Sequence, residues 1–239
     1  MEGIGMTLNE EQKKQIEKQL EAHNHKGYKK DIKISEDFIL KDFLVHEGVL
    51  RPEVMTSLSL AKWLFFNNGL YKNKAIIDIG CGSGLQGIVV GLAGAKKVIF
   101  SDISEVAVEN TKQNISLFNL NNITSLTKGN LFENVPEKAE VIVFNHPFFS
   151  DAPFDEFRSS GSMLGGGKGQ LLRAFLEESK KHLTEKGVVI MPYFKLAGEE
   201  NDPEMAGPEM GYEVQVKFDF EIKTGLQKGR VTICELRLK

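Results

Sequence analysis

The chain has 239 residues, of which 41% are hydrophobic and 26% charged, and a formal net charge of −3. This balance is that of a globular domain and excludes a disordered chain, a collagen-like fibre and a disulfide scaffold. The near-neutral charge also excludes a strongly basic nucleic-acid coat protein. No apolar run reaches the ~18 residues of a membrane span, and the first residues lack the apolar core of a signal peptide. We therefore expect a cytoplasmic protein with no membrane partner, whose Cys81 and Cys234 are reduced thiols.

Residues 1–47 are expected to form a helical extension in front of the main domain. Within it, residues 8–22 have a helical pattern with a narrow apolar stripe. Residues 26–48 mix lysine and aspartate with alternating apolar residues, a pattern that fits short strands as well as a helix. The helical period returns over residues 53–69, which end on Asn-Asn-Gly.

From residue 74 onward, short apolar runs alternate with helical segments. We expect strands at 74–80, 96–102, 123–129, 139–145 and 187–194, and helices at 85–95, 105–119 and 170–187. Such alternation predicts βαβ units and a parallel sheet. Two long strands, 212–223 and 231–239, follow with no helix between them and predict an antiparallel hairpin. The expected fold is therefore α/β, with a Rossmann-like sheet of seven strands that is mostly parallel and carries a C-terminal antiparallel hairpin.

A glycine-rich loop follows the first of these strands and reads DIGCGSG, from Asp78 to Gly84. Glycines allow a sharp turn and a close approach to a ligand, and the helix that follows offers unpaired N–H groups to an anionic group. The second strand ends at Asp102, where a carboxylate suits a ribose diol and repels a 2′-phosphate. The spacing from Gly82 to Gly87 also fits the dinucleotide fingerprint, so a nicotinamide-dependent oxidoreductase is an alternative. The terminal hairpin disfavours it, since the usual dinucleotide fold has none.

The segment Asn145-His146-Pro147-Phe148-Phe149 follows the fourth strand. Ligands bind at the carboxyl ends of the strands in open parallel sheets, so we expect this segment beside the glycine loop. The Asn145 side-chain carbonyl and the His146 main-chain carbonyl can accept the N–H hydrogens of a planar amine and localise its lone pair. Pro147 restricts the turn through its locked φ. Phe148 or Phe149 can stack on a flat substrate, at ~1–3 kcal/mol per base for a nucleobase.

Together these motifs resemble the class I S-adenosylmethionine-dependent methyltransferases. DIGCGSG, SDIS, GNLF and NHPFF occur in the order typical of that family, and residues 48–194 are similar to its "methyltransferase small" group, which modifies planar nitrogens. The resemblance implies a class I methyltransferase domain over residues 48–239. It also implies S-adenosylmethionine as the cofactor, no metal, and N-methylation of a planar amino or amide nitrogen in a macromolecule, either an RNA base or a protein glutamine.

The resemblance also assigns roles to individual residues. The residues expected to bind the cofactor lie at the carboxyl ends of the first four strands and are Asp78, Gly80, Gly82, Gly84, Asp102, Ile103, Asn130, Leu131 and Asn145. Asp78 would face the ammonium of the methionine part, Asp102 would hold the ribose, and Asn130 would lie near the adenine. The catalytic residues are expected to be Asn145, Pro147 and Phe148. The acceptor-binding residues are expected to be His146, Phe149 and Phe154.

Several alternatives remain open. His146 departs from the family's Asn-Pro-Pro-Tyr motif, and it is either a base or a side chain that points away from the acceptor. Residues 46–56 resemble two segments. Their V-L-x-P-x-x-x-T part is similar to the segment before the first motif of glutamine and base methyltransferases, and their H-E-x-x-L-x-x-x-V-x-T part to that segment of protein arginine methyltransferases. The arginine enzymes bind guanidinium with two glutamates that this site lacks. A non-catalytic methyltransferase-fold scaffold is a further alternative, disfavoured because Asn145 is retained. The long loop at residues 150–168 is expected to close over the substrate.

Overall fold

The computed structural model describes residues 14, 17, 24–53, 55–149, 167–224 and 227–239. The helix predicted over residues 8–22 lies outside them except for Lys14 and Glu17, as do Phe154 and nearly all of the predicted substrate-closing loop. None of the helices that are described combines the length and the hydropathy of a membrane-spanning segment.

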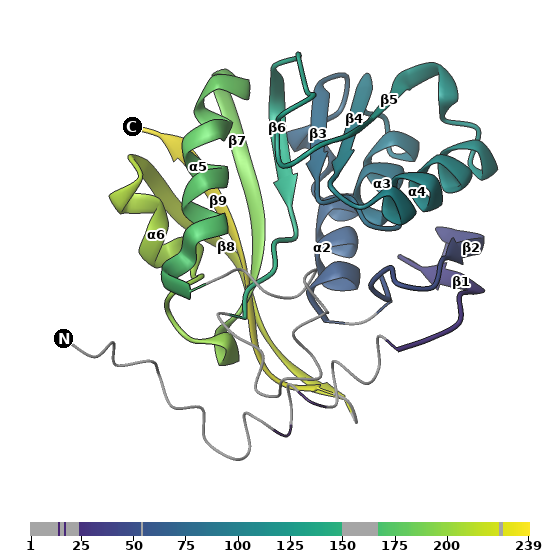
Figure 1. Ribbon diagram of the computed structural model, residues 1–239, viewed down its shortest axis with the longest axis horizontal. Coiled ribbons are helices and arrows are strands. Elements are labelled where there is room, and N and C mark those ends of the chain that lie inside the picture. The colour runs from purple at the N-terminus through teal and green to yellow at the C-terminus, as the bar shows by residue number, and fades with distance from the viewer. Residues whose placement is uncertain (1–13, 15–16, 18–23, 54, 150–166, 225–226) are drawn as a thin grey trace.

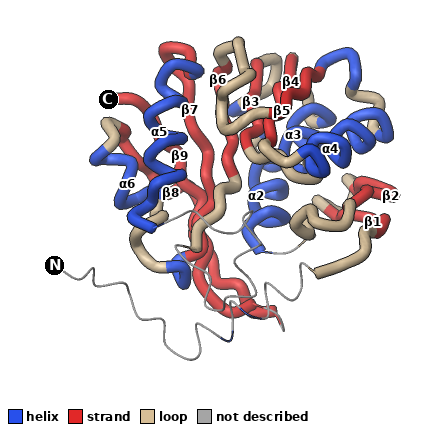
Figure 2. The backbone as a smooth tube through the Cα atoms, in the orientation of Figure 1, coloured by secondary structure: helices blue, strands red, loops and turns tan. Residues whose placement is uncertain are grey.

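A seven-stranded sheet forms the middle layer of the molecule (Figures 1 and 2). Its strands are β3 (Ala75–Ile79), β4 (Lys97–Asp102), β5 (Thr124–Lys128), β6 (Ala139–Phe144), β7 (Leu183–Phe194), β8 (Tyr212–Thr224) and β9 (Gln227–Leu238). They lie in the order β5-β4-β3-β6-β7-β9-β8, and β9 runs antiparallel to both of its neighbours. The predicted α/β class, the seven strands and the antiparallel C-terminal hairpin are confirmed.

Helices cover both faces of this sheet. They are α2 (Met55–Phe66), α3 (Leu85–Leu92), α4 (Glu105–Leu117), α5 (Gln170–His182) and α6 (Pro203–Glu209). Successive strand residues point to opposite faces, so Ile76 packs in the core of α2, α3 and α4, whereas Ile77 packs in the core of α5 and α6. The central strands therefore read as continuous apolar runs rather than as alternating ones. The two cysteines are buried free thiols, one in each core.

The C-terminal half differs from the prediction in three places. The helix predicted to reach residue 187 ends at His182, and β7 begins at Leu183, which pairs with Ala139 of β6. The strand predicted from 231 begins four residues earlier, at Gln227. Helix α6 was not predicted, although Asp202 caps it and Pro203 stands at its first position, a combination typical of a helix start.

The N-terminal segment differs most from the prediction. Strands β1 (Tyr28–Lys33) and β2 (Ile39–Val45) form a separate two-stranded antiparallel sheet. Ile32 and Phe43 are buried in the same core as α2, α3 and α4. Of the two alternatives open for residues 26–48, the structure therefore has strands at 28–33 and 39–45, because apolar side chains that alternate along a chain pack on one face of a strand. The description of residues 1–47 as a helical extension is wrong for these two segments. The domain boundary at residue 48 stays a prediction.

Candidate active site at the carboxyl edge of the sheet

The predicted site residues gather at one edge of the sheet. Ile79 at the end of β3 is in register with Ser101 of β4 and with Phe144 of β6. The residues that follow these three positions, Gly80, Asp102 and Asn145, therefore emerge side by side although they are distant in sequence. The expectation that Asn145 lies beside the glycine loop agrees with this register.

The glycine loop, residues 80–84, has a backbone shape that only glycine adopts readily. Gly80, Gly82 and Gly84 have φ values of 60°, 58° and 84°, in the left-handed region that a Cβ disfavours. Gly87 is required for another reason, because a Cβ there would lie 2.1 Å from the ring of Phe100 on β4. The close packing of α3 on β4 thus accounts for the third glycine of the dinucleotide-like spacing.

Asp102 links the glycine loop to the start of α4. Its Oδ2 accepts a hydrogen bond from the Gly82 N–H at 2.9 Å, and its Oδ1 accepts one from the Ser104 N–H at 2.9 Å. Burial raises the pKa of this carboxyl above its usual value, against the lowering effect of these N–H groups. A carboxylate has about four lone-pair directions, so Asp102 keeps acceptor capacity for hydroxyl groups of a ligand.

Asp78 is a second buried carboxyl at this edge. It is 2% exposed, and its Oδ2 accepts a hydrogen bond from the Gly87 N–H at 2.9 Å. Burial, and to a smaller extent the nearby charge of Asp102, raise its pKa to about 7 against the lowering effect of the Gly87 N–H. Within the described ranges, neither carboxyl has an ion pair with a lysine or an arginine. The edge is therefore suited to a ligand that carries positive charge.

The Asn145 side chain is held at both ends by the first turn of α2. The Thr56 hydroxyl donates to Asn145 Oδ1 at 2.7 Å, and Asn145 Nδ2 donates to the Ser57 hydroxyl at 2.6 Å. A carbonyl oxygen has two lone pairs, so Oδ1 can accept one more hydrogen bond. The sequence analysis noted Thr56 only within the 46–56 segment and missed Ser57. Because these contacts join residues 89 and 88 positions apart, no local pattern in the sequence predicts them.

His146 faces the protein interior. Its ring is 1% exposed, stacks on Tyr193 with ring centroids 5.9 Å apart, and donates from Nε2 to the Asn201 carbonyl at 2.8 Å. Burial lowers its pKa to about 4. A covered imidazole is closed to a methyl-accepting substrate in this conformation, and it does not take up a second proton near pH 7. Of the two alternatives for His146, this placement favours a side chain that points inward over a catalytic base. The ring makes structural contacts with Tyr193 and Asn201, whereas the sequence predicted that His146 binds the methyl-accepting substrate.

The two phenylalanines of the motif are also covered. Phe148 and Phe149 are 6% and 3% exposed. They pack in a small apolar cluster with Tyr193, Phe194, Ala197 and Val231. In this arrangement the rings support the turn after Asn145, and neither presents an open face for stacking. Pro147, which precedes them, is half-buried.

The remaining predicted cofactor residues lie at the ends of β4 and β5. Ile103 is 66% exposed directly after Asp102. Asn130 is exposed, whereas Leu131 is buried with a positive φ of 50°, and its carbonyl accepts a hydrogen bond from Ser101 Oγ at 2.8 Å. An exposed apolar side chain and an amide therefore lie on the open side of this edge, where the adenine was expected.

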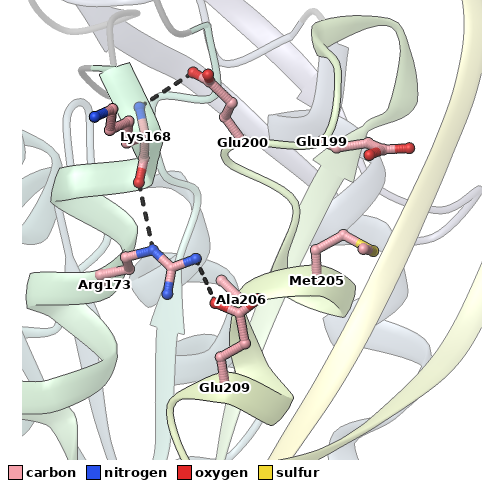
Figure 3. A pocket seen from close by; sticks show the side chains of 7 residues that line it. All are labelled: Lys168, Arg173, Glu199, Glu200, Met205, Ala206 and Glu209. Atoms are coloured by element: carbon pink, nitrogen blue, oxygen red, sulfur yellow. Dashed lines mark hydrogen bonds and ion pairs between the residues drawn. The ribbon is translucent and has the colours of Figure 1, made fainter. Parts of the chain in front are cut away.

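A charged pocket opens between α5 and α6 (Figure 3). It is lined by Lys168, Arg173, Glu199, Glu200, Met205, Ala206 and Glu209. Arg173 donates to Glu209 at 2.6 Å and to the Lys168 carbonyl at 3.3 Å, so part of its charge is neutralised internally. None of the predicted site residues lines this pocket, and we assign it no part in the predicted chemistry.

Comparisons with known proteins find methyltransferases that are similar to this chain. The family model for ribosomal protein L11 methyltransferase matches residues 55–146, which span α2 to the motif after β6. A Methanocaldococcus jannaschii protein, provisionally assigned as a protein N5-glutamine methyltransferase, is 33% identical over 74% of this chain and 91% of its own length. The ribosomal protein L11 methyltransferase of Anoxybacillus flavithermus is 28% identical over 69% of this chain, which spans 58% of that enzyme.

A solved structure shares the fold. The ribosomal protein L11 methylase of Lactobacillus delbrueckii subsp. bulgaricus superposes with a TM-score of 0.60 over 87% of this chain and 99% of that one, at 21% identity. At 21% identity this likeness shows the fold alone and does not identify the substrate that this chain methylates.

Proposed function

Because this chain belongs to the class I S-adenosylmethionine-dependent methyltransferases, we propose that it methylates the side-chain amide nitrogen of a protein glutamine. The observation that supports this most directly is the Asn145 amide, held by Thr56 and Ser57 beside the glycine loop. The similarity to a provisionally assigned protein N5-glutamine methyltransferase over 91% of that protein favours glutamine as the acceptor.

The edge described above suits S-adenosylmethionine. When bound, this cofactor supplies a methyl group on a positively charged sulfonium, which is a good leaving group. Burial raises the pKa values of Asp78 and Asp102, and neither carboxyl has a cationic partner in the described part of the chain. A positively charged ligand beside them would favour their ionised form and so bind favourably. We assign Asp102 to the ribose hydroxyls, Asp78 to the charged methionine end, and the glycine loop to close backbone contact. Ile103, Asn130 and Leu131 are assigned to the adenine.

Asn145 is assigned to the acceptor. The nitrogen lone pair of an amide is delocalised, so the acceptor is a poor nucleophile until its N–H hydrogens are bound. Asn145 Oδ1 has one lone pair engaged by Thr56 and a second available, and the main-chain carbonyl of His146 offers another acceptor. The buried His146 ring and its bond to Asn201 keep this turn rigid. Alignment of reacting groups at ~3–3.5 Å then supplies most of the rate, without a metal or a covalent intermediate.

The arginine alternative fits this site less well. A guanidinium requires carboxylates, whereas Asn145 is flanked by the hydroxyls of Thr56 and Ser57. An uncompensated buried cation would be costly. The exocyclic amino group of an RNA base has the same planar, delocalised nitrogen as an amide and can use the same acceptors. It is therefore the second candidate, and the experiment below separates the two.

The decisive experiment is transfer of a tritiated methyl group from S-adenosylmethionine into cell extract by the purified protein. We expect the label to be lost on protease treatment and retained on nuclease treatment. Hydrolysis of the labelled protein should yield N5-methylglutamine. Label that nuclease removes would overturn glutamine in favour of an RNA base, and methylated arginine would support the arginine alternative. Extract incubated with labelled S-adenosylmethionine but without the added protein is the control, because its label comes from the enzymes of the extract.

A further inference from the structure

A row of buried polar side chains on α4 joins the glycine loop to the β1–β2 hairpin. Asn110, Thr111 and Asn114 are each 0% exposed. Figure 1 shows β1 and β2 beside α4, and β2 contacts that helix. Buried polar groups are almost always hydrogen-bonded, so their partners identify what this row holds together.

Asn114 bonds to both structures at once. Its Oδ1 accepts from the Leu44 N–H of β2 at 3.0 Å, and its Nδ2 donates to the Leu44 carbonyl at 2.8 Å and to the Ser83 carbonyl of the glycine loop at 2.9 Å. A main-chain N–H only donates and a carbonyl only accepts, so the two ends of this amide cannot be exchanged. Strand β2 therefore determines that the NH₂ end of Asn114 faces the glycine loop.

Thr111 holds the neighbouring peptide in the same way. Its hydroxyl donates to the Gly82 carbonyl at 2.9 Å. In a trans peptide the C=O and the next N–H point in opposite directions, so binding of the Gly82 carbonyl to α4 turns the Ser83 N–H away from α4. The Gly84 N–H is engaged by the Cys81 carbonyl at 2.7 Å, whereas the Ser83 N–H has no partner in the described part of the chain. That donor is left for a ligand.

We propose that the β1–β2 hairpin supports the cofactor site through α4, and that Asn114 and Thr111 are positioning residues that hold the glycine loop in its ligand-binding shape. The inference rests on the proposed function in that the ligand is S-adenosylmethionine or its product. Without these bonds the loop samples other conformations before binding, and ordering it again then lowers affinity. The hairpin thereby acts on the cofactor through α4.

The chain provides a matched control in Asn110. Its Oδ1 accepts from the His46 N–H at 2.9 Å and its Nδ2 donates to the Leu44 carbonyl at 2.9 Å. Asn110 is as buried as Asn114 and bonds to the same residue of β2. Among the described residues, however, no hydrogen bond joins Asn110 to the glycine loop. Thr111→Val is the complementary change, since it removes bonds to the glycine loop and none to β2.

The experiment measures the dissociation constant of S-adenosylhomocysteine by calorimetry, and the free energy of unfolding in urea, for each variant. We expect Asn114→Leu and Thr111→Val to weaken binding about tenfold or more, and Asn110→Leu to change it by less than about threefold, although both asparagine variants lose stability. Thr111→Ser, which keeps the hydroxyl, should restore binding.

Two outcomes would overturn the inference. One is wild-type affinity in both Asn114→Leu and Thr111→Val. The other is an equal loss in Asn110→Leu, which would mean that affinity follows stability alone. If Asn114→Leu does not fold, Thr111→Val compared with Thr111→Ser decides the matter. Failure of the wild-type protein to bind S-adenosylhomocysteine would instead refute the proposed function on which the inference rests.

Discussion

Replacing Asp78 by asparagine should make the free protein more stable at alkaline pH. The carboxyl has a pKa raised by burial from 3.8 to about 7 in the folded protein. A carboxyl whose pKa is raised on folding costs no stability below its unfolded pKa, and its cost grows as pH rises toward the folded pKa. Asparagine keeps the acceptor for the Gly87 N–H and removes the charge.

The size of the effect follows from the two pKa values. The interval from 3.8 to about 7 corresponds to about 4 kcal/mol at pH 8. At pH 5 only about 1–2 kcal/mol of this cost is present. The difference in stability between Asp78→Asn and wild type should therefore grow by about 3 kcal/mol from pH 5 to pH 8. Any packing cost of the substitution is the same at both pH values and cancels in this comparison.

Urea unfolding of both proteins at pH 5 and pH 8, without cofactor, measures this quantity. Asp37→Asn, at an exposed aspartate between β1 and β2, controls for the loss of one negative charge. Addition of S-adenosylhomocysteine should then stabilise wild type more than Asp78→Asn, because the carboxylate is lost from the site. Unfolding free energies of wild type and Asp78→Asn that change in parallel between the two pH values would refute the burial argument.

Three further predictions concern the same edge of the sheet. Asn145→Ala should reduce methyl transfer at least about 100-fold while S-adenosylhomocysteine affinity in calorimetry stays within about threefold, because the amide acts on the acceptor; retained transfer would remove Asn145 from the mechanism. Asp102→Ala should weaken S-adenosylhomocysteine binding about 10- to 100-fold through lost charge-assisted hydrogen bonds, and unchanged affinity would place the ribose elsewhere. Gly87→Ala should lower the unfolding free energy by about 1–3 kcal/mol, since its Cβ would lie 2.1 Å from the Phe100 ring; a neutral effect in urea unfolding would mean that α3 shifts freely on β4.

The sequence by itself determined the parts of the protein that depend on local pattern and general topology. Apolar runs that alternate with helical periods predicted the seven strands, and glycines at the end of β3 predicted a ligand loop. Because the carboxyl ends of parallel strands lie at the same edge of a sheet, Asp102 and Asn145 were expected beside that loop, and the register at Ile79 agrees with this. These features follow from residues close in the chain and from the restricted ways in which strands join.

The tertiary structure alone decided what each side chain at the site contacts. Thr56 and Ser57 hold Asn145, and Asn114 joins Leu44 to Ser83, across separations of 31 to 89 residues. Packing also decided that residues 28–45 pair as strands and that the His146 ring turns inward. Hydrogen bonds between distant residues depend on how the helices and strands pack, and local periodicity carries no information about them. The sequence pattern therefore predicts where the site lies, whereas the packing around the site determines how its side chains are oriented.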